Sequence, residues 1–210
     1  FDRPSMLVMY MATISPQVKL PAEIRLRIPA SAGAPNAVAN CQPDGSCFNA
    51  PYDQQREGEW SILTFQATLL DLRVEYYDPQ LTKDGANRAY EFVWPGDYAV
   101  ENFLIRVQQP VGAENMLVKP GTFSTTTADD GFVYHALDAG PVPAGQTIEV
   151  AISYDKASDE LSNSSMPVES SEPLSGETAG RTSLTSALPI VLGLVGLGLI
   201  IGGGVWYWRS

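Results

Sequence analysis

The stretch WSILTFQATLLDLRVEYY, residues 60–77, decides the fold class. Its second half alternates strictly, so Leu72, Val74 and Tyr76 share one face of an extended chain, and charged residues stand between them. Its first half is rich in β-branched and aromatic residues, which favour strands. Both halves therefore predict antiparallel β-strands with one buried and one wet face.

Similar segments recur along the chain, with glycine- and proline-rich turns between them. We expect about nine or ten short strands. The other candidate segments are 5–14, 22–28, 37–40, 88–94, 100–108, 115–119, 123–127, 132–137 and 146–154. The polar segment 48–58 is expected to be irregular, and no segment shows a clear helical period. The prediction is a mainly β fold, an antiparallel β-sandwich of the immunoglobulin or fibronectin type, rather than a closed barrel.

A long apolar segment, ALPIVLGLVGLGLIIGGGVWYW, occupies residues 187–208 and holds no charged residue. At 1.5 Å per residue, about 22 helical residues span roughly 33 Å, which matches a hydrocarbon core of about 30 Å. Trp206, Tyr207 and Trp208 form an aromatic belt at its end, and Arg209 follows as a headgroup anchor. The alternative, a buried helix of a soluble protein, rarely runs so long without a polar face. We expect one C-terminal transmembrane helix at 187–208.

This expected helix contains many glycines. Gly198 and Gly202 form a GxxxG pair, which lets another helix backbone approach closely. Gly196 and Gly203 lie seven residues apart, on nearly the same face. The glycines predict that the helix packs against a helix of a partner protein.

The composition divides the chain into four parts. Residues 1–154 hold the strand pattern, and residues 155–186 form an acidic Ser/Pro/Glu-rich stalk with too few apolar residues to fold alone. The expected transmembrane helix covers 187–208, and 209–210 form a short cytoplasmic tail. The chain begins at Phe1, which is typical of an exported protein that has lost its signal peptide. We therefore expect a single-pass protein of the cell membrane whose N-terminal domain is extracytoplasmic, either periplasmic or extracellular.

Charge limits the partners. The net charge is −11, and 18 acidic but only 10 basic residues precede Asp155. An acidic domain repels phosphate backbones, so nucleic acid is excluded as a partner. The expected partners are the lipid bilayer and integral membrane subunits that contact the helix and the stalk.

Two cysteines frame the segment Cys41-Gln-Pro-Asp-Gly-Ser-Cys47, in which Pro-Asp-Gly is a strong turn signal. The turn brings the cysteines opposite each other, and the favoured reading is a structural disulfide. The alternatives are two free thiols or half of a metal site. The spacing is not Cys-x-x-Cys, and no second Cys/His cluster exists to complete a zinc site.

The sequence shows little that resembles catalytic chemistry. The single histidine, His135, has no recognisable nucleophile motif near it, and the phosphate-loop, dinucleotide and metalloprotease fingerprints are missing. Met6, Met9 and Met11 are expected in the core rather than as haem or copper ligands. We expect no enzyme activity, no cofactor and no metal site.

Aromatic side chains offer one candidate for recognition. The turn Trp94-Pro95-Gly96-Asp97-Tyr98 is the best candidate for an exposed aromatic loop, with Trp94 and Tyr98 contacting a partner or a sugar. The alternative is that most of the aromatic residues fill the sandwich core.

Three motifs also resemble a known group of proteins. They are the runs YYDP at 76–79, LTKDGA at 81–86 and FVWPGDY at 92–98. They are similar to exported single-pass β-sandwich proteins of filamentous green non-sulfur (Chloroflexota-type) bacteria. The resemblance implies the same order of sandwich, acidic stalk and anchor, and it implies no activity.

The sequence thus supports a non-catalytic, membrane-anchored accessory subunit of a larger membrane complex, such as an electron-transfer or photosynthetic assembly. The competing hypothesis is a surface-displayed binding or adhesion module for a glycan or protein ligand.

Overall fold

The computed structural model describes residues 5–121 and 123–160. Apart from one short 3-10 helix, η1 (Ala30–Ala32), the elements of these residues are strands. Every strand pair among them is antiparallel. The predicted mainly β, antiparallel fold is confirmed, and the sheets pack as sandwiches.

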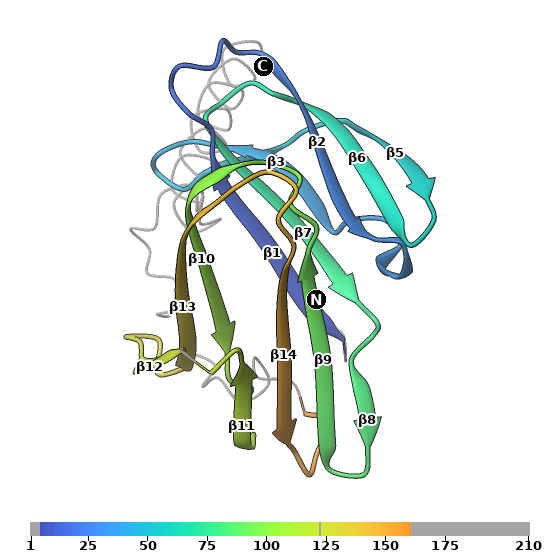
Figure 1. The fold of residues 1–210 in the computed structure, drawn as a ribbon, viewed down its shortest axis with the longest axis vertical. Helices are drawn as coiled ribbons and strands as arrows, with labels where there is room; N and C mark the ends of the chain where they lie inside the picture. Colours follow the sequence, from blue (N-terminus) through green and yellow to red (C-terminus); the bar gives the residue numbers. More distant parts are fainter. Residues whose placement is uncertain (1–4, 122, 161–210) are drawn as a thin grey trace, which may run out of the picture. The chain divides into compact units, whose positions relative to one another are not determined.

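The described strands form four hydrogen-bonded sheets (Figure 1). The first sheet has the order β1 (Met6–Thr13), β7 (Asp71–Asp78), β3 (Ala37–Cys41), β4 (Cys47–Asn49). The second has the order β2 (Ala22–Pro29), β6 (Trp60–Ala67), β5 (Tyr52–Glu57). The third has the order β11 (Glu114–Lys119), β14 (Ile148–Asp155), β9 (Asn87–Trp94), β8 (Thr82–Asp84). The fourth has the order β10 (Val100–Gln108), β13 (Val133–Val142), β12 (Ser124–Thr127).

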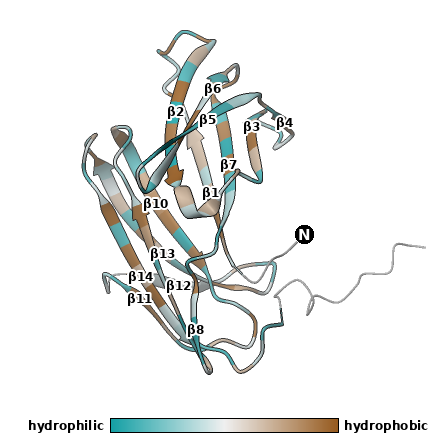
Figure 2. Ribbon diagram, turned by 90° about the vertical axis from the view of Figure 1, so that its right-hand side faces the viewer, coloured by the Kyte–Doolittle hydropathy of each residue, from teal (hydrophilic) through white to brown (hydrophobic). Residues whose placement is uncertain are grey.

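Alternation along the strands builds the core, as the alternating colours of β2 and β14 in Figure 2 show. On β2, Ile24, Leu26 and Ile28 are buried, whereas Glu23 and Arg25 are exposed. Removing such apolar surface from water stabilises the fold by roughly 25 cal/mol per Å².

The buried side chains form two clusters. The larger cluster joins the first two sheets and the end of β9 in the third, and its members are Ile24, Leu26, Ile28, Val38, Ala50, Leu63, Phe65, Ala67, Leu72, Val74, Tyr76 and Trp94. The smaller one contains Tyr90, Val107, Ala113, Val150, Ile152 and Tyr154. Val8, Phe92 and Ile148 pack against both clusters, so the two clusters form a connected core.

The segment 48–58 is not irregular as expected, because it contains the end of β4 and the whole of β5. Every residue of β5 is exposed, so no alternation of apolar and polar residues marks this segment as a strand. It is a strand because it pairs with β6 over Tyr52–Glu57. The expectation that Met9 and Met11 lie in the core is also wrong. Their side chains are 51% and 69% exposed, because they point to the outer face of the edge strand β1.

Several predictions lie outside the described residues. They are the stalk beyond residue 160, the span 187–208, the tail 209–210, the packing residues Gly196, Gly198, Gly202 and Gly203, and the interface residues Trp206, Tyr207, Trp208 and Arg209. Across residues 5–121 and 123–160, no helix is both long enough and apolar enough to cross a membrane.

Candidate functional site

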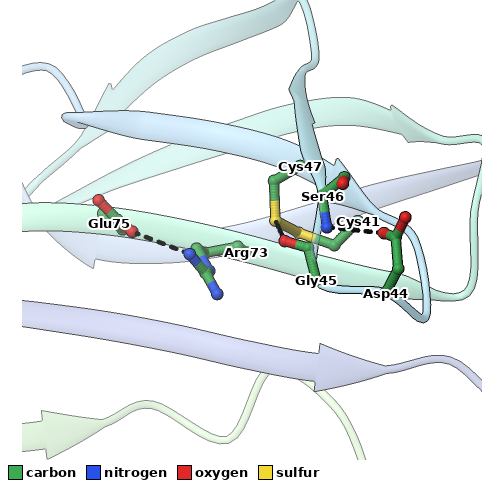
Figure 3. The surroundings of a disulfide bond; sticks show 7 residues. All are labelled: Cys41, Asp44, Gly45, Ser46, Cys47, Arg73 and Glu75. Atoms are coloured by element: carbon green, nitrogen blue, oxygen red, sulfur yellow. Dashed lines mark hydrogen bonds and ion pairs between the residues drawn. A yellow bond between two sulfur atoms is a disulfide. The ribbon is translucent and has the colours of Figure 1, made fainter. Parts of the chain in front are cut away.

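The two cysteines form a disulfide that closes the hairpin between β3 and β4 (Figure 3). Cys41 and Cys47 are directly opposite in the β3–β4 register, with their Cα atoms 4.1 Å apart. The Ser46 N–H donates to Asp44 Oδ1 at 2.9 Å, and this hydrogen bond holds the pKa of Asp44 below its usual range. The predicted disulfide is confirmed, and it makes this hairpin a rigid element at the edge of the first sheet.

Beside the hairpin lies an open hollow of about 440 Å³ with largely apolar walls. Phe48, Ala50, Pro51 and Leu69 line it, together with Asn40, Asn49, Gln66 and Thr68. Phe48 is 56% exposed although it is a large aromatic residue. The polar groups of the buried Asn40 side chain bind the backbone: its amide donates to the Gln66 carbonyl, and its oxygen accepts the N–H of Thr68 at 2.8 Å. The hollow is therefore a preformed surface with an apolar lining.

The aromatic loop after β9 divides into a buried and an exposed part. Trp94 is only 6% exposed and packs in the core, with its ring centroid 5.4 Å from that of Tyr10. Tyr98 is 39% exposed. The expectation of an exposed aromatic side chain is therefore wrong for Trp94 and confirmed for Tyr98.

Polar groups of this loop clamp the outer edge of β2. Asp97 Oδ2 accepts the backbone N–H of Arg27 at 2.8 Å, and Asp97 Oδ1 accepts the N–H of Arg27 Nε. Arg27 Nη2 donates to the Pro95 carbonyl at 3.0 Å, and Tyr98 Oη accepts the backbone N–H of Arg25 at 3.0 Å. Side chains of the loop thus satisfy two backbone donors that point away from β6. We name this arrangement the edge clamp.

A shallow pocket of about 250 Å³ lies at the edge clamp, lined by Arg25, Arg27, Ile62, Asp97 and Tyr98. Its phenol and guanidinium groups could contact a sugar or a carboxylate. Asp97 and Arg27, however, are already paired with each other. The clearest role of these residues is to hold the loop against β2.

A buried tyrosine cluster connects β1, β7 and β9. Tyr10 Oη and Tyr76 Oη lie 3.2 Å apart, and Tyr90 Oη donates to Asp78 Oδ2 at 3.1 Å. Burial raises the pKa of all three phenols. Asp78 is itself buried and accepts the N–H of Gln80 at 3.1 Å. These groups satisfy one another inside the core and have a structural role.

His135 lies on β13 with both ring nitrogens near neutral partners. Its Nε2 is 3.2 Å from Gln109 Oε1, and its Nδ1 is 3.3 Å from Thr125 Oγ1. This set lacks the carboxylate that orients the histidine of a serine-protease-type triad. Within 5–121 and 123–160, no group of three or more His, Cys, Asp or Glu side chains could hold a metal ion.

The structure brings the hairpin residues together and divides the aromatic loop between core and surface. Sequence reasoning missed Asp97 and Arg27, the charged pair of the edge clamp. They are 70 residues apart, and no local pattern links them. Phe48 was also missed, because it was placed in a segment read as irregular.

Comparison with models of known protein families finds none that matches this chain, and comparison with curated protein sequences finds no match either.

Proposed function

We propose that this chain is a non-catalytic, membrane-anchored accessory subunit, whose β-sandwich of immunoglobulin or fibronectin type docks on the extracytoplasmic side of a larger membrane complex. The proposal joins the expected helix and stalk, at 187–208 and 155–186, to the surface of the β domain. A complex that transduces energy by electron transfer or light is the class of partner that we propose.

The observation that carries the proposal is the exposed Phe48 beside its apolar hollow. A large aromatic residue exposed next to a preformed apolar surface is typical of the centre of a protein interface. The Cys41–Cys47 disulfide fixes the strand that carries Phe48, so little conformational entropy is lost when a partner binds. A disulfide also favours an oxidising compartment, which supports an extracytoplasmic location.

The test is recovery of partners from native membranes in a mild detergent. We expect the full chain to bring down integral membrane subunits, and Phe48→Ser to reduce that recovery about tenfold or more. Leu104→Ser is the matched control, because Leu104 is equally exposed but lies on β10, away from the hollow. Recovery of this chain alone would overturn the proposal.

The expected helix supplies a second, independent variant. If the Gly198/Gly202 face packs on a partner helix, Gly198→Ile with Gly202→Ile should release the chain from its complex and leave it in the membrane. Unchanged recovery of partners by this double variant would exclude helix packing through these glycines.

A second candidate function is a surface-displayed module that binds a glycan or an acidic ligand. The shallow pocket at Tyr98 and Arg25 favours it, because an exposed phenol beside a guanidinium suits a sugar ring with a carboxylate. Tyr98→Ala should then abolish binding to a glycan array while partner recovery from membranes stays intact. An array without binding would remove this candidate.

A further inference from the structure

The edge strand β1 lacks the features that usually protect a sheet edge. Exposed edges of natural sheets carry charges, prolines, bulges or very short strands, because an open edge pairs with other chains. β1 reads MLVMYMAT and has neither a charged residue nor a proline. It runs for eight residues in unbroken register with β7. Leu7, Met9 and Met11 expose their side chains along it.

The other edges of the described sheets are each protected. β4, β8 and β12 are only three or four residues long. β5 carries charged residues, and β10 and β11 carry charges and register shifts. On β2, the edge clamp binds the outward backbone donors of Arg25 and Arg27, and the strand also carries charged side chains. Among these edges, β1 is the exception.

In β1, alternate residues form backbone hydrogen bonds with β7, and the backbone N–H and C=O groups of the residues between them point away from β7. The Ile14 N–H donates to the Leu70 carbonyl at 2.8 Å, one step beyond the β1–β7 ladder. Hydrogen-bonded pairs alternate in an antiparallel ladder, so the even-numbered residues of β1 bond to β7. The N–H and C=O groups of Leu7, Met9 and Met11 therefore point away from β7, to the side of β1 where no strand of residues 5–121 and 123–160 pairs with it. The same three residues expose apolar side chains.

Two charged residues of β7 lie one strand away from this row. On β7, Arg73 is opposite Met11 and Glu75 is opposite Met9, and these two charged groups are 3.8 Å apart. If two copies met edge to edge through β1, three strand spacings, about 14 Å, would separate each charge from its counterpart. That distance exceeds the Debye length of about 8 Å at physiological salt. Self-pairing would bring no like charges together along the strand itself.

We propose that β1 pairs antiparallel with β1 of a second copy of this chain, so that the first sheets of the two copies form one continuous sheet. The inference goes beyond the proposed accessory function, and the Phe48 hollow does not take part in it. A neutral strand suits a two-fold interface in particular, because every residue there meets its own counterpart or a close neighbour.

The alternation of hydrogen-bonded residues on β1 also fixes the register. Odd-numbered residues must pair with odd-numbered residues, because only these carry the free backbone groups. Pairing Met9 with Met9 of the second copy sets Leu7 opposite Met11 on both sides, so all three exposed apolar side chains meet. A shift by one register step would set Leu7 against the hydroxyl of Thr13 instead.

Cysteine cross-linking of the full chain in membranes tests this register. The two native cysteines are bonded to each other, so an introduced thiol is the only free one. Residues opposite each other in a hydrogen-bonded pair have Cα atoms about 5.5 Å apart, within disulfide range. On mild oxidation, Met9→Cys should give a covalent dimer. Leu7→Cys alone should not, because its two copies would be about 13 Å apart.

Mixing separately tagged Leu7→Cys and Met11→Cys chains should restore cross-linking between the two tags. Leu104→Cys is the control, since it has a similar exposure on another sheet. The proposal is overturned if Met9→Cys cross-links no better than Leu104→Cys, or if Leu7→Cys alone cross-links as well as Met9→Cys. This pattern is specific to β1, so association through the expected membrane helix cannot produce it.

A charge on the strand gives an independent measurement. Met9→Lys places two like charges opposite each other and should shift the full chain in detergent from dimer to monomer by light scattering, with unchanged circular dichroism. Leu104→Lys should leave the mass unchanged. A Met9→Lys chain that stays dimeric would overturn the proposal, as would a wild-type chain that is monomeric in both detergent and membranes.

Discussion

Asp97→Ala tests the edge clamp. The Asp97 side chain is almost fully buried at 7% exposure, and its carboxylate accepts the N–H of Arg27 at 2.8 Å. A hydrogen bond to a charged group contributes about 1.5–3 kcal/mol, and its loss leaves that backbone donor without its acceptor. The second contact, to Arg27 Nε, adds only about 0.5 kcal/mol, because the Arg27 side chain is 36% exposed and screened by water.

We therefore expect Asp97→Ala to lower the free energy of unfolding by about 2–3 kcal/mol. For a domain of this size that corresponds to a fall in Tm of about 5–10 °C. Asp97→Asn keeps one acceptor oxygen and should lose about 1 kcal/mol. The measurement is thermal unfolding of the full chain in detergent, followed by far-ultraviolet circular dichroism.

Asp53→Ala is the matched control, because Asp53 is an exposed carboxylate on the edge strand β5. It should change Tm by less than about 1 °C, as surface substitutions do. The reasoning is refuted if Asp97→Ala and Asp53→Ala have the same effect, since the clamp would then contribute nothing beyond an ordinary surface charge.

Three further predictions concern the rest of the fold. The pKa values of Tyr10, Tyr76 and Tyr90 are raised in the folded chain, so these phenols stay protonated there, whereas in the unfolded chain they ionise near pH 10. The free energy of unfolding should therefore be unaffected by these groups below pH 10 and fall above it. The expected slope is about 1.4 kcal/mol per pH unit for each tyrosine. Tyrosinate absorbance should accordingly show fewer than the nine tyrosines of the chain titrating before the unfolding step. Gly96→Ala should lower the free energy of unfolding in urea by about 2–4 kcal/mol, because Gly96 has φ +79° and a Cβ there would lie 2.7 Å from the Gln146 carbonyl oxygen. Gly131→Ala is the control: Gly131 also has φ +79° but no atom within 4 Å of an added Cβ, so the loss should be smaller. Cys41→Ser with Cys47→Ser should lower unfolding stability by about 2 kcal/mol, and an equal stability of the reduced and oxidised wild type would contradict that.

Strands in which apolar and polar side chains alternate could be predicted from the sequence. A strand that is defined only by its pairing with a neighbouring strand could not. β2 and β7 were predicted within a residue or two because one face of each is buried. β5 has no buried face, so only the neighbouring β6 identifies it as a strand. The disulfide was predictable because its turn is local. The edge clamp joins residues 70 positions apart, and such a contact has no local signal.

The aromatic residues show the same limit. Trp94 and Tyr98 are four positions apart and were treated as one exposed group. The chain turns between them at Gly96, which sends Trp94 into the core and leaves Tyr98 at the surface. A pattern of residue types cannot show which side of such a turn faces solvent, because the packing of a distant strand decides it.

β1 was correctly predicted as a strand, but its methionines were wrongly expected in the core. An uncharged apolar strand reads as core, and the methionines were placed there. The sheet order instead makes β1 an edge, which turns the same residues into an exposed apolar row. An open edge is an aggregation hazard for a freely diffusing protein. A proposed membrane anchor changes this balance, because confinement to one surface raises the effective concentration of a second copy in a fixed orientation. A short strand pair, too weak to hold two free domains together, can then dimerise anchored ones, and the neutral edge of β1 becomes a specific contact.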